Sequence, residues 1–370
     1  MSRIAVIGTG LIGGSVALGL RSNVPSIHIT GFDLDSATLD SALEVGAIDR
    51  VATSAADAAS GAELVVLAIP VDRTEEVCRE LKGVIGQGAV VTDVGSSKAD
   101  AVAAGGSAFG PAFVGGHPMA GSERHGIDAA DPGLFQDAWW ILTPTPDTAP
   151  ESYARVATMA SSLGAKPIAL HPHDHDMLLA RLSHLPQLVA STLVDVAVGG
   201  GRDDAVLNLA ASGFRDVTRI AASHPDMWIA IMRSNRSAVL EALGTLGERL
   251  EAVGDMISAG HWDDLRAFLE TSRTARLELF AKPESGGEPV ALDMSVPDRP
   301  GVLAEVTTAA SALGVNIEDL RIIHSTEGGR GRLEVIVIGD DRAAKLEVAL
   351  VELGYRVERS TGSGSVEATP

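Results

Sequence analysis

The sequence predicts three domains in succession: an α/β domain with a mostly parallel sheet, an all-helical domain, and a small α+β domain. Up to about residue 170, short apolar runs alternate with helix-like segments, which is typical of a parallel sheet covered on both faces. From Met177 to about Phe280 the pattern is helical. After residue 289 the predicted order β-α-β-β-α-β is that of a ferredoxin-like split unit.

The first domain, expected over residues 1–172, begins with a buried strand and a glycine-rich turn into a helix. We interpret as strands the segments 3–7, 27–32, 64–70, 89–93, 113–115, 139–143 and 167–170. We interpret as helices a segment that ends near Arg21 and the segments 36–45 and 73–82.

The second domain, expected over 173–281, consists of Ala- and Leu-rich helices that break at Gly199–Gly201, Ser223–Pro225 and Gly260. Such a large apolar helical surface favours pairing with a second copy, so we expect a homodimer. Residues 282–289 have the composition of a flexible linker. The third domain is expected over 290–360, with strands at 290–296, 317–325, 332–338 and 355–359 and helices at 301–313 and 343–353. The Gly-, Ser- and Thr-rich residues 361–370 are expected to be disordered.

Composition excludes several classes of function. Hydrophobic residues are 45% and charged residues 21%, as in ordinary globular proteins. The chain has 29 Lys and Arg against 49 Asp and Glu, and its net charge of -20 disfavours nucleic acid and anionic membranes. A single cysteine, Cys78, rules out an internal disulfide or a zinc cluster. Glycines interrupt the N-terminal apolar stretch, so we expect neither a signal peptide nor a membrane helix, and a cytoplasmic location.

The glycine-rich turn predicts a dinucleotide site. Gly8-x-Gly10-x-x-Gly13 follows a strand and opens a helix, and Asp33 stands at the end of the second strand. This context is that of a Rossmann-type domain, in which the glycines admit the cofactor pyrophosphate to the helix N-terminus. Asp33 would accept hydrogen bonds from the adenosine ribose and so favour NAD over NADP. The alternatives are a purely structural turn and, for Asp33, a cap on the next helix.

Two further segments follow predicted strands at the edge where a nicotinamide enzyme holds its substrate. In the first, Ser96 can hydrogen-bond a substrate hydroxyl or the nicotinamide ribose, or it caps the following helix. In the second, His117 lies on a glycine-rich loop, whose glycines we expect to open room for a ligand. A neutral imidazole there would take the proton from an alcohol that loses hydride.

Three other groups of residues have competing interpretations. The string His171–Asp176 is tempting as a metal site, but Pro172 and a helix start at Met177 favour a solvated loop, so we expect no metal. His184 lies in a helix beside a proline, either in the site or as a satisfied core histidine. Arg219 is a candidate clamp for a carboxylate, with a surface ion pair as the alternative.

Five motifs stand out along the chain: Gly8-x-Gly10-x-x-Gly13 with Asp33, Asp93–Lys98, Gly116–Gly121, Ser183–Pro186 and Phe214–Ala221. Together they resemble the bacterial prephenate/arogenate dehydrogenase family of tyrosine biosynthesis, and the resemblance covers nearly the whole chain. The set is specific, although no single motif is.

The resemblance implies NAD-dependent oxidative decarboxylation of prephenate to 4-hydroxyphenylpyruvate. It implies that His117 is the catalytic histidine bonded to the C4 hydroxyl and that Ser96 orients that hydroxyl and the nicotinamide. It implies that Arg219 binds the substrate carboxylate, with His184, Asp216 and Trp228 around the pocket. The cofactor-binding residues that it implies are Gly8, Gly10, Leu11, Ile12, Gly13, Asp33 and Pro70. The chain departs from the family at Gln187, where a second histidine is frequent.

The C-terminal unit is similar to an ACT domain, a module that commonly binds amino acids between paired copies. The implied effector residues are Asp298, Gly301, Val302, Leu303, Asn316 and Ile317. Our hypothesis is a regulatory site for tyrosine, or less favourably phenylalanine, and the alternative is a purely structural module.

Three rival functions stay open at this point. The same enzyme preferring arogenate would yield tyrosine directly, and the spacing of the motifs does not decide between the substrates. A 3-hydroxy acid dehydrogenase usually relies on a lysine in the helical domain, and Met177 to Phe280 contains no lysine. A ligand-sensing protein regulated by NAD and an amino acid is the non-enzyme alternative.

Overall fold

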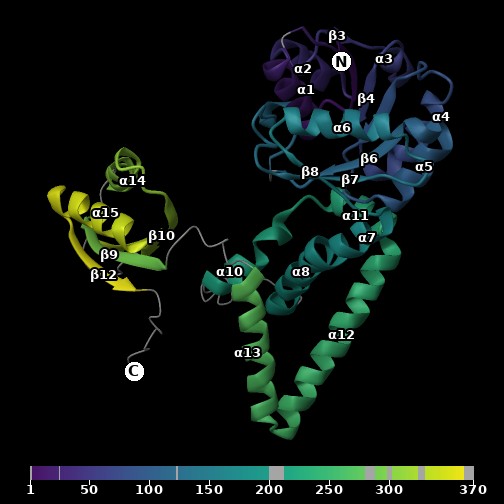
Figure 1. The fold of residues 1–370 in the computed structure, drawn as a ribbon. Helices are drawn as coiled ribbons and strands as arrows, with labels where there is room; N and C mark the ends of the chain where they lie inside the picture. Colours follow the sequence, from purple (N-terminus) through teal and green to yellow (C-terminus); the bar gives the residue numbers. More distant parts are fainter. Residues whose placement is uncertain are drawn as a thin grey trace. The chain divides into compact units, whose positions relative to one another are not determined.

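The structure is a computed structural model, and it describes residues 2–24, 26–121, 124–199, 212–279, 288–297, 302–323 and 330–361. The chain forms two compact units, Met1–Ala252 and Val253–Pro370 (Figure 1). Some predictions lie outside the described residues: the effector residues Asp298 and Gly301, most of the linker, and the tail beyond Thr361.

The first unit contains an eight-stranded sheet of order β3-β2-β1-β4-β5-β6-β7-β8. Its strands are β1 (Arg3–Ile7), β2 (His28–Phe32), β3 (Arg50–Val51), β4 (Leu64–Leu67), β5 (Val90–Asp93), β6 (Phe113–Pro118), β7 (Trp139–Thr143) and β8 (Lys166–Ala169). Neighbours pair in parallel except β6 with β7. The predicted mostly parallel sheet is therefore confirmed, with β3 as an addition that is too short to give a sequence pattern.

Helices cover both faces of this sheet because the strands are apolar on both sides. In β1, Ile4 and Val6 pack into one core, whereas Ala5 and Ile7 pack into the other, as the two-residue period of a strand dictates. The helices are α1 (Leu11–Asn23), α2 (Ser36–Glu44), α3 (Ala55–Ala59), α4 (Thr74–Leu81), α5 (Ala99–Phe109) and α6 (Pro150–Ser162), with short turns η1 (Val71–Arg73), η2 (Gly110–Ala112) and η3 (Ile127–Ala129). We had not placed α3 and α6, although Pro150 at the first position of α6 is a known start signal.

The helical part of this unit starts earlier than predicted. It comprises α7 (Pro172–Leu179), a π-helical turn η4 (Ala180–His184), α8 (Leu185–Val198), α10 (Ser212–Thr218), η5 (Arg219–Ala222), α11 (Pro225–Ser234) and α12 (Arg236–Ala259), the last of which runs into the second unit. The expected start at Met177 is wrong, because Pro172 takes the first helical position and the His171 side chain caps the helix. The predicted break at Gly199 is confirmed by its left-handed backbone (φ +55°).

One continuous helical stretch, Pro172–Val198, is long and apolar enough by composition to cross a membrane. It also carries His175 and Asp176, which are buried and hydrogen-bonded inside the first unit. We therefore interpret the beginning of this stretch as part of the folded first unit.

The second unit holds helix α13 (Trp262–Leu279) and a four-stranded sheet of order β10-β11-β9-β12. The sheet module consists of β9 (Pro289–Pro297), α14 (Val302–Ala312), β10 (Ile317–Ile323), β11 (Arg330–Ile338), α15 (Asp340–Glu352) and β12 (Arg356–Thr361). Its pairs are antiparallel, and apolar residues of β9, β11 and the two helices form a core of their own. The predicted β-α-β-β-α-β order is confirmed.

Candidate active site

The turn after β1 is a cradle in which the backbone is closely packed on the protein side and open on the other. Gly8 has φ +91°, and a Cβ built on it would overlap the Ala68 carbonyl. A Cβ on Gly13 would overlap the Gly8 carbonyl oxygen, so both positions need glycine for packing. At Gly10, by contrast, a Cβ meets no atom of the described residues within 4 Å. Packing alone does not explain Gly10, whereas a ligand against the N-terminus of α1 does.

Asp33, directly after β2, is hydrogen-bonded to the glycine-rich turn. Its Oδ2 accepts a hydrogen bond from the backbone N of Thr9 at 2.8 Å, and its Oδ1 accepts from the backbone N of Asp35 at 3.2 Å. The alternative of a helix cap is wrong, because Asp35 rather than Asp33 caps α2. The order β2-β1-β4 brings Asp33, the glycine turn and Pro70 to one edge of the sheet. Leu11 and Ile12 open α1 there, and both are half-buried.

A buried ion pair is hydrogen-bonded to the backbone of the residue before His117. Asp93, the last residue of β5, pairs with the ammonium of Lys98, which is fully buried. Asp93 Oδ1 accepts from the Gly116 N at 3.1 Å, and Lys98 Nζ donates to the Gly116 carbonyl oxygen at 2.8 Å. Burial lowers the pKa of Lys98, and the charge of Asp93 opposes that effect. The pair thus fixes both backbone polar groups of Gly116.

The sequence predicts that the glycines before His117 open room for a ligand, and this prediction is wrong. A Cβ on Gly115 would overlap Thr143 Oγ1, and one on Gly116 would lie 2.6 Å from the Asp93 carbonyl oxygen. Both glycines serve close packing between β6 and its neighbours. His117 itself lies within β6, opposite Ile141 of β7, rather than on a loop after it.

Three side chains from two distant segments form a buried hydrogen-bonded chain. His117 Nδ1 lies 2.8 Å from His175 Nε2, and His175 Nδ1 lies 2.8 Å from Asp176 Oδ1. All three are nine-tenths or more buried. The interpretation of His171–Asp176 as a solvated loop is therefore wrong: the segment is helical, and its His175 and Asp176 belong to the interior. Within the described ranges no group of three or more His, Cys, Asp or Glu is placed to hold a metal.

The Asp176 carboxylate, which belongs to α7, caps the N-terminus of helix α5. Its Oδ1 accepts from the Lys98 N at 2.7 Å and its Oδ2 from the Ala99 N at 2.8 Å. These backbone hydrogen bonds and that of His175 lower the pKa of Asp176 against the opposing effect of burial. The alternative in which Ser96 caps this helix is wrong, because Lys98 occupies the N-cap position. Ser96 is half-buried and lies between Asp93 and this cap.

Burial keeps His117 and His184 neutral. Burial lowers the pKa of His117 well below 6.5, and the neighbouring basic groups of His175, Lys98 and His184 disfavour a further positive charge there. Burial also lowers the pKa of His184 to about 4, although Asp176 acts in the opposite direction. A neutral imidazole is suited to accept a proton.

Around His184 the structure leaves two buried polar atoms without partners. Asn235 Nδ2 lies 3.2 Å from His184 Nδ1 and donates to the Asp176 carbonyl oxygen, so His184 is partnered as a core histidine would be. The Trp228 ring lies edge-on to His184, with centroids 6.1 Å apart. Gln187 Oε1 and Trp228 Nε1 find no hydrogen-bond partner among the described residues. Such atoms are costly unless a ligand or water satisfies them, which favours a polar ligand here.

The two remaining substrate candidates lie on the surface of the first unit. Arg219 begins η5, Asp216 lies in α10, and both side chains are exposed. Neither is a member of the buried network around His117.

Sequence reasoning missed five members of that network. They are Asp93, Lys98, His175, Asp176 and Asn235. Asp93 and Lys98 belong to a motif that we had noted, but without a role. His175 and Asp176 were detectable from Pro172 as a helix start, because a helix from there puts His175 and Leu179 on one face.

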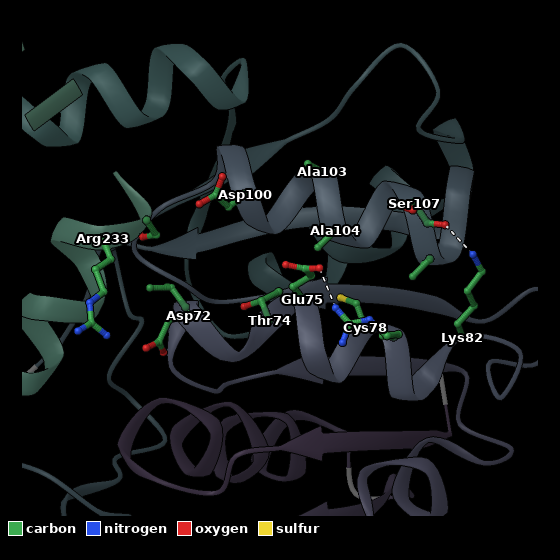
Figure 2. A pocket seen from close by; sticks show the side chains of 14 residues that line it. Asp72, Thr74, Glu75, Cys78, Lys82, Asp100, Ala103, Ala104, Ser107 and Arg233 are labelled. Atoms are coloured by element: carbon green, nitrogen blue, oxygen red, sulfur yellow. Dashed lines mark hydrogen bonds and ion pairs between the residues drawn. The ribbon is translucent and has the colours of Figure 1, made fainter. Parts of the chain in front are cut away.

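A separate cavity of about 740 Å³ lies between α4 and α5 (Figure 2). Glu75 and Cys78 of α4, Asp100 and Ala104 of α5, and Arg233 are among its lining residues. Burial raises the pKa of Asp100, and the charges of Asp176 and Glu75 raise it further. None of the site residues expected from the sequence lines this cavity.

Three family models match the chain in succession. They are the nucleotide-binding domain of prephenate dehydrogenase over residues 16–169, the dimerization domain of prephenate dehydrogenase over 171–271, and the ACT domain over 290–353. A prephenate dehydrogenase of Bacillus subtilis is 33% identical over 93% of this chain and 94% of its own length. The chain belongs to the prephenate dehydrogenase family. The chain is accordingly an oxidoreductase, which decides against the ligand-sensing alternative.

Two solved structures resemble three quarters of the chain. The prephenate dehydrogenase of Aquifex aeolicus, in complex with hydroxyphenyl propionate and NAD+, is 30% identical, with a TM-score of 0.71 over 75% of this chain and 98% of that one. The arogenate dehydrogenase of Synechocystis is 31% identical, with a TM-score of 0.66 over 75% of this chain and 99% of that one. Because both activities occur at equal similarity, membership leaves the substrate undecided.

Proposed function

We propose that the chain is an NAD-dependent prephenate dehydrogenase of tyrosine biosynthesis, which converts prephenate to 4-hydroxyphenylpyruvate and carbon dioxide. The observation that carries the proposal is the neutral, buried His117, whose Nδ1 is engaged by His175. Its Nε2 is then the atom available to the substrate. A cytoplasmic location, expected from the sequence, is part of the proposal.

The residues of the cradle fit NAD. Gly10 leaves space against the N-terminus of α1 for the pyrophosphate, and Asp33 lies at the end of the neighbouring strand, where a ribose hydroxyl would reach it. The carboxylate of Asp33 disfavours a 2′-phosphate and hence NADP. Leu11, Ile12 and Pro70 complete the cofactor contacts that we assign.

The chemistry assigns each site residue one task. When bound, NAD accepts the hydride that leaves ring carbon C4. His117 Nε2 accepts the C4 hydroxyl proton at the same time, and Ser96 orients that hydroxyl. The bond between C1 and its carboxylate breaks, carbon dioxide leaves, and the electron pair restores the aromatic ring. The C4 oxygen then takes the proton back from His117 Nε2, which gives the hydroxyl of 4-hydroxyphenylpyruvate and returns His117 to its neutral form. Aromatisation drives the reaction, so the protein chiefly aligns the reacting groups.

Arg219 binds a substrate carboxylate through its guanidinium, and Asp216, His184 and Trp228 border the substrate. The exposure of Arg219 and Asp216 fits a site completed when two copies pair. Support for pairing comes from exposed apolar side chains on α8 and α12, among them Val196, Leu240 and Leu250. A homodimer is therefore part of the proposal, with domains at 1–172, 173–281 and 290–360 joined by the linker 282–289.

The ACT module is proposed to bind tyrosine as an effector. Val302 is buried and Leu303 is exposed at the start of α14, while Asn316 and Ile317 enter β10. Asn316 donates to Glu318 at 2.6 Å, so its side chain is held at this turn. The test is isothermal titration of tyrosine into the whole enzyme. Binding that lowers turnover supports the proposal, whereas neither heat nor an effect on activity contradicts it.

One observation favours arogenate as the alternative substrate. The unpartnered Gln187 Oε1 is an acceptor, which suits the amino group of arogenate better than the keto group of prephenate. The deciding experiment follows NADH absorbance with purified enzyme, NAD and either substrate. A higher kcat/KM for prephenate supports the main proposal, and a higher value for arogenate replaces it. No NADH with either substrate would refute both.

A further inference from the structure

The hydrogen bonds from His117 to His175 and from His175 to Asp176 determine which ring nitrogen of each histidine carries the proton. Asp176 is held as a carboxylate by two backbone N–H groups, so the proton in its contact with His175 belongs to His175 Nδ1. In neutral His175, Nε2 is then an acceptor, and the proton in the contact with His117 belongs to His117 Nδ1. Neutral His117 is left with its lone pair on Nε2.

We infer that His175, anchored by Asp176, is a positioning residue that holds His117 in the tautomer able to act as a base. This inference rests on the proposed function, because it assigns Nε2 of His117 to the substrate hydroxyl. In the reaction, the proton taken up on Nε2 makes His117 an imidazolium. Its Nδ1–H keeps His175 Nε2 as acceptor, and the charge of Asp176 stabilises the new cation through His175.

Further hydrogen bonds hold both ends of the series His117, His175 and Asp176 in place. Asp176 caps α5 with both carboxylate oxygens, and its carbonyl oxygen accepts from Asn235 Nδ2 at 2.8 Å. At the other end, Lys98 and Asp93 fix the backbone of Gly116, the residue before His117. His175 is fully buried between these two supports. Its ring is therefore held at both nitrogens.

The charged groups that face His117 determine how this device responds to acid. They are His175 and Asp176 of α7, Lys98 ahead of α5, His184 of η4 and, through Gly116, Asp93 of β5. If His175 takes the first proton, its Nε2–H donates to His117 Nδ1, and neutral His117 must then carry its proton on Nε2. One added proton on either His117 or His175 therefore leaves His117 Nε2 without a free lone pair, and His117 can no longer act as a base.

The test compares three variants at one protein concentration. In His175→Phe the acceptor is lost, and we expect kcat to fall about 100-fold while the Kd for NAD is unchanged. His175→Gln offers an amide oxygen to His117 Nδ1–H and recovers part of the lost kcat. His173→Gln, an exposed histidine on the same helix, leaves all parameters unchanged.

A second measurement separates positioning from loss of structure. In protein labelled with 15N-histidine, the Nδ1 and Nε2 shifts of His117 report its tautomer at neutral pH. The inference predicts the Nδ1–H form in the unchanged enzyme and a shift toward the Nε2–H form in His175→Phe. An Nε2–H tautomer in the unchanged enzyme, or a His175→Phe variant with normal kcat, overturns the inference. Failure of the proposed function is distinct, since the unchanged enzyme would then show no turnover.

Discussion

Replacing Lys98 by Met tests whether the buried ion pair supports the catalytic strand. Lys98 and Asp93 are both buried, and the substitution leaves the Asp93 carboxylate without its cation. Leaving one charge of a buried pair uncompensated costs about 3–5 kcal/mol in the free energy of unfolding. The double variant Asp93→Asn with Lys98→Met removes both charges and keeps an acceptor for the Gly116 N. It should therefore be clearly more stable than Lys98→Met alone, although both variants lack the donor to the Gly116 carbonyl oxygen.

Denaturant unfolding followed by tryptophan fluorescence measures these differences at one protein concentration. Lys166→Met is the matched control, because Lys166 pairs with Asp137 at the surface and its removal should change stability little. In Lys98→Met the acid limb should also move to higher pH, because the charge of Lys98 lowers the pKa of His117. A loss below about 1 kcal/mol in Lys98→Met, or a double variant no more stable than the single one, would refute this reasoning.

Three further outcomes are expected. Gly10→Ala should weaken NAD binding about tenfold or more, because its Cβ would occupy the space that we assign to the cofactor. Its stability should be unchanged, because no atom of the described residues lies within 4 Å of that Cβ. Gly13→Ala, by contrast, should lower the unfolding midpoint, because its Cβ overlaps the Gly8 carbonyl oxygen. The acid limb of kcat/KM should lie below pH 6.5, because the lowered pKa of His117 keeps the base neutral down to that pH; a limb at or above 6.5 contradicts this assignment. Arg219→Leu should raise the KM for prephenate about tenfold or more with an unchanged Kd for NAD, as steady-state kinetics and titration will show.

The architecture was predictable because it depends on local patterns. The short apolar run of β1 and the glycine turn after it specify a strand, a tight turn and a helix, and all three are present. The β-α-β-β-α-β module was predictable for the same reason. Short elements such as β3 and α3 were missed because two to five residues carry no period.

The site was only partly predictable, because its key contacts join residues far apart in sequence. His117 was identified from its position after a strand, but its contact with His175 spans 58 residues. Lys98 shows why burial misleads sequence reasoning: a lysine is expected at the surface, and its burial depends on Asp93 and the Gly116 carbonyl oxygen. The error at His171–Asp176 arose from reading Pro172 as a loop residue when it begins a helix.

The most direct test of the central claim is His117→Asn, with turnover of prephenate and NAD affinity measured on the same preparation. We expect kcat to fall by about 10³-fold or more while the Kd for NAD stays within about twofold, because Asn cannot accept the hydroxyl proton. His173→Asn, at an exposed position, is the control and should keep full activity. If His117→Asn retained turnover within about tenfold of the unchanged enzyme, His117 would not be the base and the account would be wrong.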